Sequence, residues 1–210
     1  FDLDGTLIDS LGGITAAANA VLADHALPPI GLDLTAGFVG RGEAVFVDRL
    51  IAATALNAEA RTDILSSFIG HYAKAAETTP LMPGARAALD ALHACGIEMG
   101  LVTNKPRSPL GPTLEAAGLA GHFAVILAGD DLPLRKPDPA PLFEAMRRLG
   151  APSCIYVGDS DIDGETARAA GQRFLLYTEG IRTVPVDDIP HTAAFADFAV
   201  LPDLVEQLLR

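Results

Sequence analysis

The chain has 210 residues, half of them hydrophobic, and its 27 acidic against 15 basic residues give a net charge of −12. This acidity argues against nucleic acid and anionic membranes as partners, because both are bound through basic faces. No segment approaches the roughly 18 continuous apolar residues of a membrane span. Cys95 and Cys154 form no CxxC pair, which predicts two reduced, buried thiols in a cytoplasmic protein.

The first ten residues place two carboxylates, Asp2 and Asp4, among apolar positions and follow them with Gly5 and Thr6. Positions two apart share one face of a strand, and two like charges there are unfavourable unless a cation or a proton relieves them. Gly5 permits a sharp turn at the end of the strand. An ordinary Asp-Gly turn is the alternative interpretation, but the full Asp-X-Asp-Gly-Thr pattern favours a catalytic role for these residues.

Residues 11–81 form the next section, in which apolar side chains recur at helical spacing in three successive runs. Asp9 or Ser10 is suited to cap the first run. Pro80 begins the return to a different pattern. This section is therefore expected to be entirely helical.

From Gly84 onward, strand-like apolar runs alternate with helical ones. The expected helices cover residues 84–95, 108–117, 138–149, 162–170 and 202–209, and the expected strands cover residues 97–102, 125–128, 154–157 and 174–177. Such alternation predicts a parallel sheet with helices on both faces. The expected fold class is α/β, a three-layer Rossmann-like core with a parallel sheet plus an inserted all-helical cap domain. The core comprises residues 1–10 and 82–210, and the cap comprises residues 11–81, inserted after the first strand.

A second polar motif, Thr103-Asn104, follows an expected strand. Ligands gather at the carboxyl ends of strands in open parallel sheets. The Thr103 hydroxyl and the Asn104 backbone amide are suited to hold anionic oxygens there. A turn that only caps the following helix is the alternative, because such turns have the same Thr-Asn sequence. A third motif places Lys136 just before a helix, where its charge joins the helix dipole in attracting an anion. A solvated basic loop at Arg135-Lys136 is the alternative.

The fourth motif, Gly158 to Gly164, supplies Asp159 and Asp163 after another expected strand. For Asp163, a purely structural helix cap remains an alternative. Asp161, between them, receives no role.

These four motifs, in this order, resemble those of the haloacid dehalogenase superfamily in its phosphatase branch, and the resemblance covers nearly the whole chain. It rests on Asp2-Leu3-Asp4-Gly5-Thr6, Val102 to Pro106, Gly129-Asp130-Asp131, Lys136-Pro137-Asp138-Pro139 and Gly158 to Asp163. Several of these strings are similar to the phosphoglycolate phosphatase group. The resemblance implies a cytoplasmic hydrolase, a phosphoric monoester phosphatase, that acts on a small phosphorylated metabolite as a monomer or homodimer.

The resemblance also implies roles for the site residues. Asp2 attacks phosphorus and forms an aspartyl phosphate, while Asp4 donates and accepts protons. Thr103, Asn104 and Lys136 hold the phosphate.

Four acids at one sheet edge, together with an anionic substrate, require a hard cation, and Mg²⁺ with several waters fits. The resemblance assigns it to the Asp2 carboxylate, the Asp4 backbone carbonyl and the Asp159 carboxylate. Asp163 either supports these ligands or contacts the metal through water.

The expected substrate is 2-phosphoglycolate, and its selection is expected to come from the cap. Gly40-Arg41-Gly42 places a cation on a flexible backbone, suited to pair with a carboxylate. A surface arginine in a turn is the alternative. The competing functions are a hexose-phosphate phosphatase or phosphosugar mutase of the same superfamily and, more remotely, a phospho-accepting receiver module.

Overall fold

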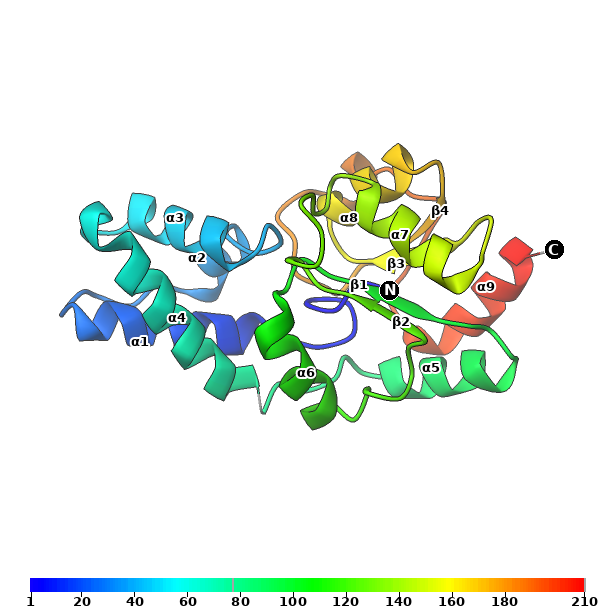
Figure 1. Ribbon diagram of the computed structural model, residues 1–210, viewed down its shortest axis with the longest axis horizontal. Coiled ribbons are helices and arrows are strands. Elements are labelled where there is room, and N and C mark those ends of the chain that lie inside the picture. The colour runs from blue at the N-terminus through cyan, green and yellow to red at the C-terminus, as the bar shows by residue number, and fades with distance from the viewer. Residues whose placement is uncertain (77, 210) are drawn as a thin grey trace.

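The computed structural model describes residues 1–76 and 78–209 and shows an α/β protein with a helical lobe at one end (Figure 1). The helical lobe contains α1 (Leu11–Asp24), α2 (Leu32–Ala36), α3 (Glu43–Ala53), a short 3-10 turn η1 (Ala58–Ala60) and α4 (Arg61–Ala76). The other lobe contains α5 (Ala85–Ala94), β1 (Gly100–Val102), α6 (Arg107–Ala116), β2 (Val125–Leu127), α7 (Ala140–Leu149), β3 (Ile155–Gly158), α8 (Asp161–Ala169), β4 (Arg173–Tyr177), η2 (Val186–Asp188), β5 (Ala193–Phe195), η3 (Phe198–Val200) and α9 (Leu201–Leu209).

The amino-terminal residues join two groups of parallel strands into one sheet. β1 pairs with β2, and β4 lies between β3 and β5, all in parallel register. The Phe1 nitrogen donates to Gly100 O, and Val102 N donates back to Phe1 O, which is the pattern of a parallel pair. On the other side, Asp2 N donates to Val157 O at 2.8 Å. The sheet order is therefore β2, β1, residues 1–3, β3, β4 and β5.

Helices cover both faces of this sheet, as parallel strands require. Successive residues of a strand point to opposite faces. Leu101 accordingly joins a buried cluster with residues of α5, α6 and α9, while Val102 joins a second cluster with residues of α7 and α8. Figure 1 shows α7 and α8 on one side of the strands and α5 and α9 on the other. The predicted fold class is confirmed.

The helical lobe has a hydrophobic cluster of its own, built from α1, α3 and α4 with Phe38 from the loop after α2. The rings of Phe46 and Phe68 stack within it at 4.7 Å between centroids. The two chain segments that connect the lobes run side by side, since Asp9 N donates to Pro80 O and Ile8 forms an antiparallel bridge with Leu81. This arrangement supports a cap at residues 11–81, whose exact limits stay a prediction.

Several local expectations differ from the structure. The strand expected at residues 97–102 begins only at Gly100, and β5, which reads Ala-Ala-Phe, was not expected because it lacks β-branched residues. Cys95 is exposed, contrary to the buried thiol that was expected, and Cys154 is half-buried; both are free. Among the described residues, no helix combines the length and the apolar character needed to cross a bilayer.

Candidate active site

The four sequence motifs converge at the carboxyl edge of the sheet, around a cavity of about 60 Å³. Asp2 and Asp4 lie in and just after the amino-terminal segment, Thr103 follows β1, Asp159 follows β3, and Lys136 lies in the loop between β2 and α7. All five side chains line the cavity. The helical lobe supplies the opposite wall through residues of α1, α3, α4 and the Val39–Gly42 loop.

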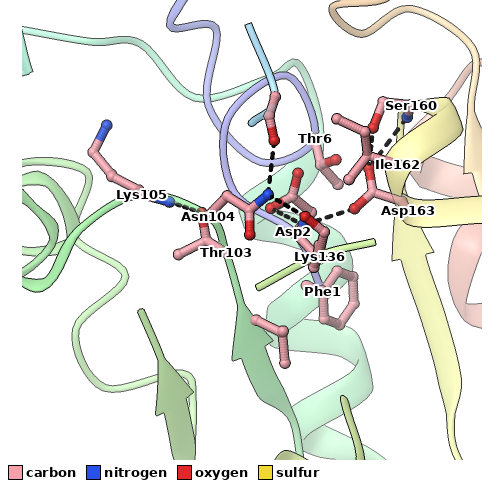
Figure 2. A network of polar contacts seen from close by, with 12 residues as sticks. Phe1, Asp2, Thr6, Thr103, Asn104, Lys105, Lys136, Ser160, Ile162 and Asp163 are labelled. Carbon is pink, nitrogen blue, oxygen red and sulfur yellow. Dashed lines mark hydrogen bonds and ion pairs between the residues drawn. The ribbon is translucent and has the colours of Figure 1, made fainter. Parts of the chain in front are cut away.

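Lys136 lies between two carboxylates at the floor of the site (Figure 2). Its ammonium nitrogen is 2.8 Å from Asp2 Oδ1 and 2.7 Å from Asp163 Oδ1, and it donates to the Tyr156 hydroxyl at 2.9 Å. Burial alone would lower the pKa of Lys136, but the Asp163 and Asp2 charges outweigh it and raise that pKa above its ordinary value. Lys136 is therefore a permanently charged group. Arg135, beside it, is exposed.

Asp163 caps a helix and also forms an ion pair with Lys136, while its predicted support of a metal stays a prediction. It forms a capping box with Ser160 at the start of α8, accepting from Ser160 Oγ at 2.7 Å. Its other oxygen accepts from Lys136, in the ion pair described above. Burial opposes ionisation of Asp163, but Lys136 and the Ser160 hydrogen bonds prevail and lower its pKa. The helix cap thus fixes a charged carboxylate behind Lys136.

Asp159 is held from both sides by neighbouring loops. Oδ1 accepts from the Thr6 hydroxyl at 2.6 Å, and Oδ2 accepts from the Ile181 backbone amide at 2.7 Å. These loops approach closely because Gly5 and Gly180 carry no side chain: a Cβ on either would collide with the Asp159 side chain. Burial, with the charges of Asp163 and Asp2, raises the pKa of Asp159 well above its ordinary value.

Asp2, Asp159 and Asp163 form a potential cation site. One carboxylate oxygen from each lies within 4.8 Å of the others. Burial, followed by the Asp163 charge, raises the pKa of Asp2 from 3.8 to about 7. Three buried carboxylates with one ammonium leave an excess of negative charge, and all donors are oxygens, so this set fits a hard divalent cation.

Asp4 faces the helical lobe rather than the acid cluster. Its Oδ1 accepts from the Tyr72 hydroxyl of α4 at 3.0 Å and from the Lys105 ammonium at 3.2 Å. Lys105 also donates to the Tyr72 hydroxyl and lies 4.0 Å from the centroid of its ring. Burial and the Asp4 charge raise the pKa of Tyr72 well above its ordinary value, which keeps it a proton donor. Asp4 therefore touches both lobes at once.

In the motif after β1, Thr103 lines the cavity and Asn104 connects two loops through hydrogen bonds. Thr103 is buried beside the cavity, and its Oγ1 accepts from Lys105 N at 3.1 Å. Asn104 uses its side chain differently from a phosphate ligand, because Nδ2 donates to Gly40 O at 2.8 Å and to Lys136 O at 2.9 Å (Figure 2). It thereby links the cap loop to the loop of Lys136. The predicted role of its backbone amide stays a prediction.

Arg41 is not among the cavity-lining residues that the structure describes, although its neighbours Gly40 and Gly42 are. Its side chain is half-buried. The structure therefore does not bring Arg41 together with the other candidate residues, and its role in substrate binding stays a prediction.

Sequence reasoning gave no role to several residues that line or support the cavity, among them Tyr72, Lys105, Tyr156 and Glu43. Tyr72 and Tyr156 stand in apolar runs that fit a core equally well, so no local signal distinguishes them. Lys105 was visible in the second motif but received no role. Glu43 is a buried carboxyl group of α3, and burial raises its pKa to about 7.

Comparisons with known proteins agree with this geometry. Residues 1–171 match the family model of the haloacid dehalogenase-like hydrolases. A phosphoglycolate phosphatase of Cereibacter sphaeroides is 44% identical over 212 residues, covering 100% of this chain and 97% of that protein. One of Rhodobacter capsulatus is 41% identical, covering 98% and 95%. A crystal structure of a predicted phosphoglycolate phosphatase from Haemophilus somnus 129pt has a TM-score of 0.93 at 30% identity, covering 97% and 95%. The chain belongs to the haloacid dehalogenase-like hydrolase family.

Proposed function

We propose that this protein is a Mg²⁺-dependent phosphomonoester hydrolase that works through an aspartyl phosphate and converts 2-phosphoglycolate to glycolate and phosphate. The proposal depends most on one observation: the carboxylates of Asp2 and Asp4 line the same cavity but have different surroundings. Asp2 contacts Lys136 within the acid cluster, whereas Asp4 contacts Lys105 and Tyr72 toward the cap. Different surroundings suit two acids with different tasks.

Asp2 is the nucleophile of this proposal. Its carboxylate oxygen forms a bond to phosphorus as the bond from phosphorus to the ester oxygen breaks, which leaves phosphate on Asp2. Lys136 stabilises the negative charge on the phosphoryl oxygens, and the Thr103 hydroxyl donates to one of them. Asp4 gives a proton to the departing ester oxygen, then takes one from the water that cleaves the aspartyl phosphate.

The acid cluster would hold Mg²⁺ through the carboxylates of Asp2 and Asp159, with the Asp4 backbone carbonyl as the further predicted ligand. Asp163, already paired with Lys136, supports this set. When bound, the cation would neutralise charge on the phosphoryl oxygens and orient them. The helical lobe, whose Tyr72 lines the cavity, would limit the access of bulk water to the site.

The choice of 2-phosphoglycolate is supported by the relatives that carry the name phosphoglycolate phosphatase. Family membership over residues 1–171 favours a hydrolase over a receiver module. A cytoplasmic location and a monomeric or homodimeric state stay predictions.

The test is phosphate release from a panel of small phosphomonoesters with Mg²⁺ present. The highest kcat/KM is expected for 2-phosphoglycolate, with steady turnover. A higher kcat/KM for a hexose phosphate would overturn the substrate while leaving the phosphatase assignment intact. A single phosphorylation event without turnover would instead indicate a receiver-like protein.

A further inference from the structure

The cavity contains few positively charged side chains, and these differ in how many carboxylates of the protein they already contact. Among the lining residues that the structure describes, the cations are Lys105 and Lys136. Lys136 already contacts Asp2 and Asp163 at the phosphoryl end. A substrate with a second negative charge therefore has Lys105 as its available cation in this cavity. Figure 2 shows Lys105 on the far side of Asn104 from Lys136, so the two charges serve different parts of the site.

The Lys105 ammonium is fixed in place rather than free in solvent. Its side chain is 1% exposed, and its nitrogen lies over the ring of Tyr72. An ammonium has three N–H donors. Asp4 Oδ1 and the Tyr72 hydroxyl accept two of them, and no acceptor for the third is found among the described residues. One donor of a buried, positioned cation is therefore left to face a ligand.

The position of Lys105 relative to Asp4 indicates which part of a bound substrate would lie next to Lys105. Asp4 is the group that protonates the departing ester oxygen, so it lies beside that oxygen during the reaction. Lys105, at 3.2 Å from Asp4, lies next to the atoms that follow the ester oxygen in the leaving group. In 2-phosphoglycolate a single methylene separates the ester oxygen from the carboxylate. A carboxylate at that point would reach Lys105.

We infer that Lys105 is the residue that selects an anionic leaving group, by donating a charge-assisted hydrogen bond to the substrate carboxylate, with Tyr72 holding its ammonium in place. The inference rests on the proposed phosphatase function and goes beyond it by naming the selecting residue. It replaces Arg41, which the sequence favoured, because Arg41 is not a lining residue of the cavity whereas Lys105 is.

The experiment compares two phosphate esters that differ only in the leaving group: 2-phosphoglycolate and 2-phosphoglycolamide, in which a neutral amide replaces the carboxylate. Wild type, Lys105→Met and Lys74→Met are assayed with both. Lys74 is an exposed lysine of α4 and provides the matched control for losing one positive charge. Lys105→Met is expected to raise KM for 2-phosphoglycolate about 10- to 100-fold, the value of a charge-assisted hydrogen bond, and to change KM for the amide much less. Lys74→Met is expected to keep the wild-type ratio.

The informative quantity is the ratio of kcat/KM for the two esters, because it does not depend on the fraction of enzyme that is folded. If Lys105→Met yields no folded protein, Lys105→Gln removes the charge while keeping an N–H donor for Asp4, and the same fall in the ratio is expected. Equal losses on both esters would overturn the inference and make Lys105 a residue that only positions Asp4. A selective loss in Arg41→Ala without one in Lys105→Met would also overturn it. Failure of the proposed function is separate, since it shows as a wild-type preference for a hexose phosphate.

Discussion

The ammonium nitrogen of Lys136 lies 2.8 Å from Oδ1 of Asp2, and the two residues are 134 positions apart in the chain. The contact joins the loop before α7 to the amino-terminal segment at the centre of the sheet. It orients Asp2 and compensates part of its charge. Removing one member of a buried ion pair leaves the other charge uncompensated.

Lys136→Ala is therefore expected to reduce kcat/KM by about 10²-fold or more, because the positive charge that meets the phosphoryl oxygens is lost. The thermal midpoint of unfolding should fall as well, since Asp2 and Asp163 lose their shared partner. Arg135→Ala, one residue away and exposed, is the matched control and should change both quantities little. Equal effects of the two variants would contradict the role given to Lys136.

Substitutions of Asp2 and of Asp4 are expected to impair different steps of the reaction. Asp2→Asn removes the nucleophile, so neither turnover nor covalent phosphate should be detected. Asp4→Asn removes the proton donor, which matters less for an ester with a good leaving group such as an aryl phosphate. This variant should lose most turnover yet still accept phosphate on Asp2. Denaturing gels after incubation with radiolabelled substrate distinguish the two, and label on the Asp2→Asn protein would sink the assignment.

Metal binding should depend on pH because the acid cluster binds protons in the metal-free protein. The folded pKa of Asp2, about 7, lies above its unfolded value of 3.8. The folded state therefore holds this proton more tightly, and the stability that Asp2 contributes is full below pH 4 and is lost as pH rises toward 7. Mg²⁺ binds the ionised form and competes with that proton.

The increase in Tm on adding Mg²⁺ should accordingly be larger at pH 8 than at pH 6, as measured by differential scanning calorimetry. At pH 6, about one unit below the Asp2 pKa, the apparent affinity should be at least about tenfold weaker than at high pH, because Asp159, whose pKa is also raised, binds a proton in the same cluster. Asp159→Asn should abolish most of the increase at both pH values. Phosphatase activity should vanish with a chelator and return with Mg²⁺. Full activity in metal-free protein, or an equal increase in Tm at both pH values, contradicts the proposal.

A substitution at Gly129 tests how tightly the loops at the carboxyl edge of the sheet are packed. A Cβ at this position would overlap the backbone carbonyl of Asn104, which cannot move without displacing Thr103 and Lys105. Gly129→Ala should cost about 1–3 kcal/mol in the free energy of unfolding, the usual cost of overpacking, and should lower kcat. Gly121→Ala, where a Cβ meets nothing within 4 Å, is the control and should leave both unchanged. Unaltered kinetics in Gly129→Ala would show that this loop tolerates displacement.

The sequence by itself determined the fold class and the core of the site. Alternation of strand and helix periods predicts a parallel sheet with covered faces, and polar residues that follow several strands of such a sheet must meet at one edge. Asp2, Asp4, Thr103, Lys136 and Asp159 all line the resulting cavity. Of the two basic residues in the third motif, Lys136 is buried and Arg135 is exposed, and the phosphate-binding role given to Lys136 stays a prediction.

Only the tertiary structure decided what the helical lobe contributes to the cavity. The side chains on that wall are set by how α4 packs against α1 and α3 and by how the lobe contacts the core, and no local pattern encodes these contacts. Tyr72 has the spacing of a core residue yet donates to Asp4, 68 positions away. Arg41 has the chemistry of an anion ligand yet is not among the lining residues, while Lys105 is. Helical periodicity records which side of a helix is buried, but not whether that side faces a neighbouring helix or a ligand.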